Sequence, residues 1–93
     1  MPRYMIVRAF DCGEEEMPEV GSRSRKVIEE HYPEIVWEHS HVVVLDDGQV
    51  MTYCVYAAPT EQMVWDHSND LGRHTIKEIL EIAGDVTPAD FPA

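Results

Sequence analysis

Alternation of apolar and polar residues, the pattern of a strand at a sheet surface, occurs in four stretches of this chain. The predicted strands cover residues 3–10, 35–45, 49–57 and 75–82. The second stretch carries the strongest strand signal, because valine, isoleucine and tryptophan dominate it. Asp46-Asp47-Gly48 separates it from the third and is a favourable hairpin turn, in which Gly48 is free to adopt a positive φ. We therefore expect the second and third strands to pair antiparallel.

Two further stretches place apolar residues at the spacing of an amphipathic helix. The first covers residues 14–31, with glutamates at its start and basic residues later, the order that the helix dipole favours. Pro18 is tolerated only in the first turn of a helix, so we expect the helix proper to begin near Met17. The second helix begins after Thr60, a suitable N-cap, and ends before Gly72, a natural C′ residue.

The predicted order strand, helix, strand, strand, helix, strand is that of the ferredoxin-like, split βαβ fold, an α+β architecture. It implies one four-stranded antiparallel sheet with both helices on one face. Residues 1–82 would form this domain, and residues 83–93 would form a C-terminal tail with two prolines. The uncovered face would carry Trp37 and tyrosines, and an exposed apolar face predicts association. We therefore expect a homodimer that packs through its sheets.

The charge balance narrows the classes of partner. The 93 residues suffice for one domain with a modest core. Seven Lys and Arg against 18 Asp and Glu give a formal charge of −11, which disfavours nucleic acid and anionic membranes and favours cations, metal ions among them. The alternative is that the acidity merely keeps a small protein soluble.

Several patterns predict the cellular compartment. The chain shows no secretory signal and no apolar run of membrane-spanning length. Its two cysteines, Cys12 and Cys54, make no disulfide framework. We therefore expect a cytoplasmic protein with reduced thiols.

His39 and His41 lie two residues apart in the second predicted strand, so strict alternation places them on one face with Trp37 and Val43. Neutral imidazoles bind nickel, copper, zinc and cobalt, and two on one face can share an ion. A carboxylate or a partner subunit could supply the remaining ligands, and so could three other residues: Cys54, His67 and His74. The alternative is a half-buried pair at a sheet interface, hydrogen-bonded to backbone or water.

Further side chains with possible chemistry are scattered along the chain. Cys54 lies inside the third predicted strand, and His67 at the margin of the core-facing side of the second helix; such a pair can be a nucleophile with its base or two metal ligands. The alternative for Cys54 is a buried, inert thiol. His74 follows the second helix at an exposed corner, Cys12 lies in a surface loop, and Arg8 is a charge amid aromatic residues on one face of the first strand. The chain has no glycine-rich phosphate loop, CxxC, HExxH or nucleophile elbow.

A set of uncommon residues is distributed over most of the chain. It comprises Val36-Trp37-Glu38-His39-Ser40, Asp47-Gly48, Tyr53-Cys54-Val55-Tyr56-Ala57-Ala58-Pro59, Glu61, His67-Ser68 and Gly72. In these motifs the chain resembles a family of small bacterial ferredoxin-like domain-of-unknown-function proteins that are linked to nickel binding. The resemblance covers residues 1–82 and implies a ferredoxin-like fold, a homodimer and nickel ions held at the dimer surface.

The resemblance is carried residue by residue. The positions that match the family's motif are Trp37, His39, Ser40, Cys54, Tyr56 and His67. His41 departs from it, since an aromatic residue is expected there. The loop after Gly72 is shorter than in the family, and the C-terminal tail is longer.

Three hypotheses of function remain. The leading one is a homodimeric protein that binds a divalent transition metal, nickel first, for buffering or metal response rather than catalytic turnover. The expected ligands are His39, His41 and His67, followed by Cys54 or His74. The second is an enzyme or small-molecule binder of the dimeric α/β-barrel kind, with a pocket lined by Trp37, Cys54 and His67. The third is a structural or interaction module without a site.

Overall fold

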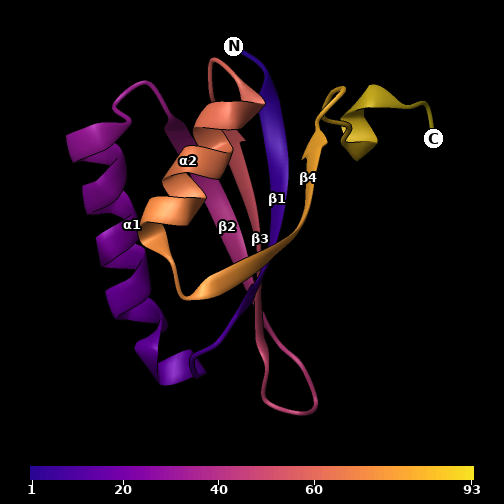
Figure 1. Cartoon of the computed structure of the whole chain (residues 1–93). Helices are drawn as coiled ribbons and strands as arrows, with labels where there is room; N and C mark the ends of the chain where they lie inside the picture. The colour runs from indigo at the N-terminus through magenta and orange to yellow at the C-terminus, as the bar shows by residue number, and fades with distance from the viewer.

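The computed structural model describes the whole chain, residues 1–93 (Figure 1). In chain order the elements are β1 (Arg3–Phe10), η1 (Glu14–Glu16), α1 (Met17–His31), β2 (Val36–Val44), β3 (Val50–Ala57), α2 (Glu61–Leu71), β4 (His74–Glu81) and η2 (Pro88–Asp90). The predicted order of strands and helices is confirmed, and α1 begins at Met17 with Pro18 in its first turn. The prediction that His74 lies at an exposed corner was wrong. His74 is the half-buried first residue of β4, where the ladder pairs it with Phe10.

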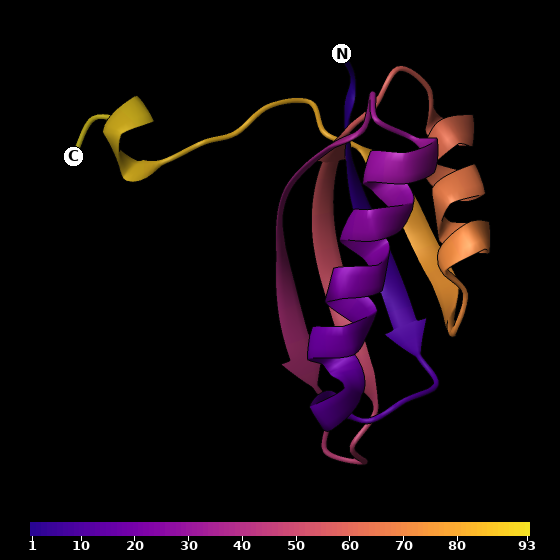
Figure 2. The same cartoon turned by 90° about the vertical axis from the view of Figure 1, so that its left-hand side faces the viewer.

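The four strands form one sheet in the order β2-β3-β1-β4, and every neighbouring pair is antiparallel. α1 and α2 lie side by side over one face of this sheet, as Figures 1 and 2 show. No helix covers the opposite face. This is the ferredoxin-like, split βαβ arrangement that the order of elements predicts. No helix of the structure is both long enough and apolar enough to span a membrane.

The core lies between the sheet and the two helices. One group of buried apolar side chains consists of Tyr4, Ile6, Ile28, Ile35, Cys54, Tyr56, Ala58 and Val64. A smaller group consists of Phe10, Val20, Val50 and Leu71. Local signals hold the elements in place. Thr60 Oγ1 accepts a 3.2 Å hydrogen bond from the backbone N–H of Met63 and so caps α2, and Gly48 adopts a φ of 88° in the hairpin turn.

A β-bulge in β2 changes which side chains share a face. Trp37 pairs with Tyr56 and His39 pairs with Val55, so Glu38 between them has no partner on β3. The extra residue shifts the alternation, because side chains on either side of a bulge no longer follow a strict period of two. The prediction that Trp37 shares a face with His39 and His41 was therefore wrong. Trp37 faces the helices, where its ring lies 6.1 Å from that of Tyr56.

The face of the sheet without helices, called the open face below, mixes apolar residues with histidines. The cross-strand register places Met5, Val7, Ala9, His39, His41, Val43, Met51, Tyr53, Val55 and Leu80 on it. Leu80 and Val43 are 51% and 38% exposed. The open face thus carries Tyr53, one of the predicted tyrosines, but lacks the predicted Trp37.

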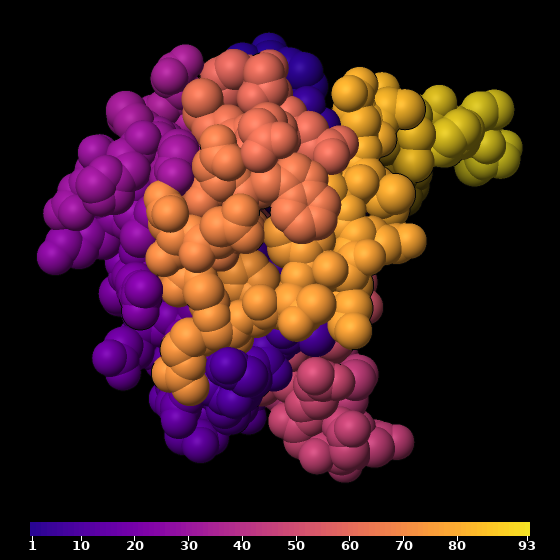
Figure 3. Space-filling model, in the orientation of Figure 1, coloured from indigo at the N-terminus to yellow at the C-terminus, as the bar shows by residue number.

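The C-terminal tail leaves the sheet on the side of the open face (Figure 2). Its residues Val86 and Phe91 expose 73% and 60% of their surface. The tail is tied to the domain near its start, because Arg3 Nη1 donates a 2.7 Å hydrogen bond to the Asp85 carboxylate. In the space-filling view of Figure 3, both the tail and the tip of the β2–β3 hairpin project from the body of the domain.

Candidate functional site

His39 and His41 form a pair of exposed imidazoles on the open face of β2. They oppose Val55 and Tyr53 on β3, and their ring centroids lie 5.4 Å apart at an angle of 74°. Both side chains are exposed, so their ring nitrogens are accessible to an ion from solution. Two neutral imidazoles at this spacing suit a divalent transition metal, for which nitrogen ligands are preferred.

The other predicted ligands lie on the opposite side of the sheet. His67 on α2 and Cys54 on β3 are buried at 0% and 4% exposure between the sheet and the helices. His74 lies across from Phe10, whose side chain is also in the helix-facing core. No three His, Cys, Asp or Glu side chains come together in the chain. A single copy therefore offers the pair His39 and His41 as its exposed histidine ligands and does not bring all five predicted residues to one point.

His67 is held in a buried polar cluster. Its Nε2 lies 3.2 Å from Ser24 Oγ of α1, and its ring packs edge-on against Tyr56 at 5.5 Å and against Tyr32 at 6.2 Å. Burial and, to a smaller extent, the positive charge of Arg8 lower the pKa of His67 to about 4. The imidazole is therefore neutral near pH 7. Its Nδ1 is buried without a hydrogen-bond partner.

Cys54 and His67 do not form a nucleophile–base pair in this structure. The Cys54 thiol donates to Thr52 Oγ1 at 3.5 Å, whereas the hydrogen-bond partner of His67 is Ser24. Cys54 belongs to the apolar core, so the alternative of a buried, inert thiol describes its setting.

His74 and Cys12 are fixed by packing at the far end of the sheet. His74 Nδ1 lies 2.7 Å from the carbonyl oxygen of Gly72, and its ring centroid is 5.1 Å from that of Phe10. Burial lowers the pKa of His74. Cys12 is half-buried against the smaller core group rather than free in a loop, and burial raises the pKa of its thiol.

Arg8 is the residue whose importance the sequence signals only weakly. It is 1% exposed, and its Nη2 donates a 2.9 Å hydrogen bond to Ser68 Oγ of α2. The guanidinium carbon lies 5.2 Å from the centroid of the Tyr56 ring, a cation–π contact. Its Nε is buried without a partner. The one sequence signal is the placement of Arg8 among aromatic residues on a face of β1 that is otherwise apolar.

A cavity of about 110 Å³ lies between α1, α2 and the helix-facing side of the sheet. Its polar lining consists of Arg8, Ser24, Ser40, Thr52, Cys54 and Tyr56. Its apolar lining consists of Phe10, Met17, Val20, Trp37, Val42 and Leu71, with Gly21 beside them. Of the three side chains expected to line a small-molecule pocket, Trp37 and Cys54 do so, and His67 does not.

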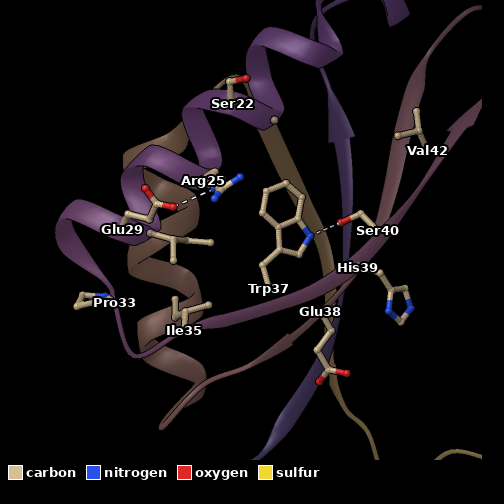
Figure 4. A pocket seen from close by; sticks show the side chains of 12 residues that line it. Ser22, Arg25, Glu29, Pro33, Ile35, Trp37, Glu38, His39, Ser40 and Val42 are labelled. Carbon is tan, nitrogen blue, oxygen red and sulfur yellow. Dashed lines mark hydrogen bonds and ion pairs between the residues drawn. The ribbon is translucent and has the colours of Figure 1, made fainter.

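An open groove between α1 and β2 lies next to this cavity (Figure 4). Trp37 stands in the groove, and its Nε1 donates a 2.8 Å hydrogen bond to Ser40 Oγ. Across from it, Arg25 and Glu29 form an ion pair at 2.9 Å on α1. In Figure 4, His39 lies on the opposite side of the β2 ribbon from Trp37, as the bulge requires.

Comparison with solved structures agrees with the fold. The chain is similar to the C-terminal domain of the MgtC protein from Mycobacterium tuberculosis, with a TM-score of 0.60 and 11% identity over 90% of this chain and 88% of that one. It also matches a structural genomics protein named YJCS, with a TM-score of 0.45 and 14% identity over 91% of this chain and 100% of that one. At such low identities the likeness to the MgtC domain concerns the fold alone.

Comparison with protein families is more specific. No curated protein matches the chain. The family model described as nickel responsive protein SCO4226-like matches residues 4–82, which include all four strands and both α-helices. This agrees with the resemblance that the motifs around Trp37, Cys54 and His67 indicate. The chain belongs to the SCO4226-like family of nickel-responsive proteins.

Proposed function

We propose that this protein is a homodimeric nickel-binding protein that acts in metal buffering or metal response. The observation that carries the proposal is the exposed pair His39 and His41 on the open face, in a chain whose family is described as nickel-responsive. Imidazole nitrogens bind nickel well, and the formal charge of −11 favours the approach of a cation. The proposed ligands are therefore His39 and His41.

A second copy of the chain would complete the site. One chain provides two imidazoles, and transition metals take four or more ligands. In a two-fold dimer packed through the open faces, each subunit contributes the same patch, so the partner would bring its own histidine pair. The exposed apolar residues of the open face, among them Val43, Tyr53 and Leu80, would be buried by the same contact.

The C-terminal tail supports this mode of association. It projects on the side of the open face and exposes Val86 and Phe91, two apolar side chains without a packing surface in their own chain. A partner docked on the open face would lie within the region that the tail enters. We propose that the tail contributes to the dimer contact.

Other nearby groups contribute less to the proposed site. Glu38, next to His39, receives two hydrogen bonds from Arg3 at 2.7 and 3.0 Å, and this pairing lowers the pKa of its carboxyl. Glu38 is therefore already neutralised by an arginine. His67, Cys54 and His74 face the helices, so the proposal gives them no part in an ion site shared with His39 and His41.

Calorimetric titration of nickel into protein purified without a histidine tag tests the proposal. The wild type should bind nickel, and the His39→Ala/His41→Ala double variant should lose most of that binding. His31→Ala removes an exposed imidazole on α1 and is the matched control, which should bind as the wild type does. Unchanged nickel affinity in the double variant would remove the central claim.

Sedimentation equilibrium tests the dimer separately. Val43→Asp places a charge in the middle of the open face and should shift the protein to monomer. Trp65→Gln, which changes an exposed side chain on α2, is the control and should leave the association unchanged. A wild type that is monomeric with and without nickel would refute the proposed assembly.

A further inference from the structure

Arg8 is a buried positive charge without a negative partner. Its side chain is 1% exposed, and none of the ion pairs of the structure includes it. Its neighbours are neutral: the Ser68 hydroxyl accepts one hydrogen bond, and the Tyr56 ring lies against the guanidinium. Buried charges in proteins are normally paired, because an unpaired one carries a large desolvation cost. The missing partner is therefore a feature that calls for a ligand.

The cavity beside Arg8 has the chemistry to hold that ligand. Hydroxyl groups of Ser24, Thr52 and Tyr56 line it together with the Cys54 thiol, and all four side chains are buried. Phe10, Met17, Val20 and Leu71 make the rest of the wall apolar. A small ligand with one anionic end and a short hydrocarbon end would match this division.

The net charge around the cavity indicates the charge of the ligand. His67, the nearest other basic side chain in the helix-covered core, is neutral near pH 7, because burial lowers its pKa to about 4. Arg8 is then the single positive charge in the lining of the cavity. One guanidinium with a free Nε–H balances one carboxylate, which arginine recognises through planar hydrogen bonding.

The volume of the cavity limits the ligand to a few atoms. At about 110 Å³ it is smaller than a cavity of about 150 Å³ that accepts benzene, so about four to six non-hydrogen atoms would fill it. We propose that this cavity binds a short-chain monocarboxylate, with the carboxylate on Arg8 and the alkyl end against Val20 and Leu71. The site is distinct from the nickel ligands, which lie across the sheet.

A route into the cavity is present in the structure. Gly21, Trp37, Ser40 and Val42 line both the cavity and the open groove between α1 and β2. The two carboxylates of that groove are each paired with an arginine, Glu29 with Arg25 and Glu38 with Arg3. An anion that enters through the groove therefore does not meet an unpaired negative charge at its walls.

Proton–nitrogen NMR titration of the full chain with sodium propionate tests this proposal. Propionate should cause saturable shifts of the Trp37 indole N–H and of backbone amides around the cavity, such as those of Val20 and Cys54. Propionamide has nearly the same shape without the charge, and sodium chloride gives the same ionic strength. Neither should cause these shifts at concentrations where propionate saturates them.

Variants connect the shifts to Arg8. Arg8→Met should abolish saturable propionate binding, and Arg8→Lys should weaken it about tenfold or more, because the planar donor is lost while the charge stays. Arg25→Met removes an exposed arginine of the groove and should bind as the wild type does. If Arg8→Met does not fold, the Arg8→Lys titration decides.

Two results would overturn the proposal. One is a wild type that shows no saturable shifts with propionate up to tens of millimolar, or equal shifts with propionamide. The other is a folded Arg8 variant, either methionine or lysine, that binds propionate as tightly as the wild type. Either result would leave Arg8 as a buried charge held by Ser68 and Tyr56 alone.

Discussion

The two faces of the sheet place the same type of side chain under opposite conditions. On the helix-covered face, His67 is fully buried, contacts Ser24 and two tyrosine rings, and is neutral near pH 7. On the open face, His39 and His41 are exposed side by side. The difference teaches that a histidine in this fold is a candidate metal ligand because of the face it occupies, and that residue type alone does not decide it.

The two faces also differ in how completely their polar groups are satisfied. The covered face holds Arg8 Nε and His67 Nδ1 without partners, which marks it as a place where a small ligand could be accommodated. The open face holds apolar residues without a cover, which marks it as a place where another chain could dock. The proposed carboxylate site and the proposed dimer follow from these two kinds of incompleteness.

The largest expected effect separates the faces by stability. Ile6 on the covered face is 0% exposed, so Ile6→Ala should lower the free energy of unfolding by about 2–5 kcal/mol. Leu80, 51% exposed on the open face, is the matched change, and Leu80→Ala should cost no more than about 0.5 kcal/mol in a free monomer. Urea denaturation at low protein concentration measures both. Equal losses would mean that the open face is as buried in solution as the core.

The next effect is the pH dependence that His67 contributes. Its pKa is about 4 when folded, below its ordinary value of 6.5, so the unfolded chain takes up the proton first as the pH falls. The contribution to stability is full above pH 6.5 and decreases between pH 6.5 and 4, by up to about 3 kcal/mol. His67→Gln should flatten this part of the profile in chemical denaturation. Parallel pH profiles for the wild type and the variant would contradict the assignment.

A smaller effect concerns the bulged strand between the two faces. Ser40→Ala removes the acceptor of the Trp37 indole N–H and should cost about 1 kcal/mol, because a half-buried donor then lacks a partner. Tryptophan fluorescence during urea denaturation measures the change. Ser22→Ala, an exposed serine on α1, is the control and should not alter stability. A Ser40→Ala variant as stable as the wild type would show that the indole finds water instead.

The smallest effect concerns the attachment of the tail. Arg3→Ala removes the exposed contacts with Glu38 and Asp85 and should leave the midpoint of thermal unfolding almost unchanged. The tail should nevertheless be cut sooner by a protease, because its link to β1 is lost. Arg25→Ala removes an exposed pair on α1 and should not affect cleavage of the tail. Identical cleavage rates in the two variants would separate Arg3 from the position of the tail.

The fold was predictable from sequence because its signals are local. Alternation marks the four strands, Pro18 and Thr60 mark helix starts, and Asp46-Asp47-Gly48 marks the hairpin. Each of these depends on residues within a few positions, so a single sequence contains the information.

The site was predictable only in part, because its decisive features are not local. The bulge at Glu38 depends on how β2 pairs with β3, and alternation alone places Trp37 on the wrong face. The setting of Arg8 depends on Ser68, 60 residues away, and on Tyr56 across the sheet. The pair His39 and His41 was predicted correctly as neighbours on one face, because two residues on the same side of the bulge keep their alternation.

The bulge at Glu38 has a consequence for how this strand can vary. The one unpaired residue directs Trp37 toward the interior and His39 and His41 toward the outside. Substitutions in β2 change what a position carries but leave its direction intact. Deletion of one residue between Trp37 and His39 would instead exchange the two directions, sending either the indole out or the imidazoles in. The number of residues in this segment, more than their identity, therefore constrains which related sequences can keep both faces as they are.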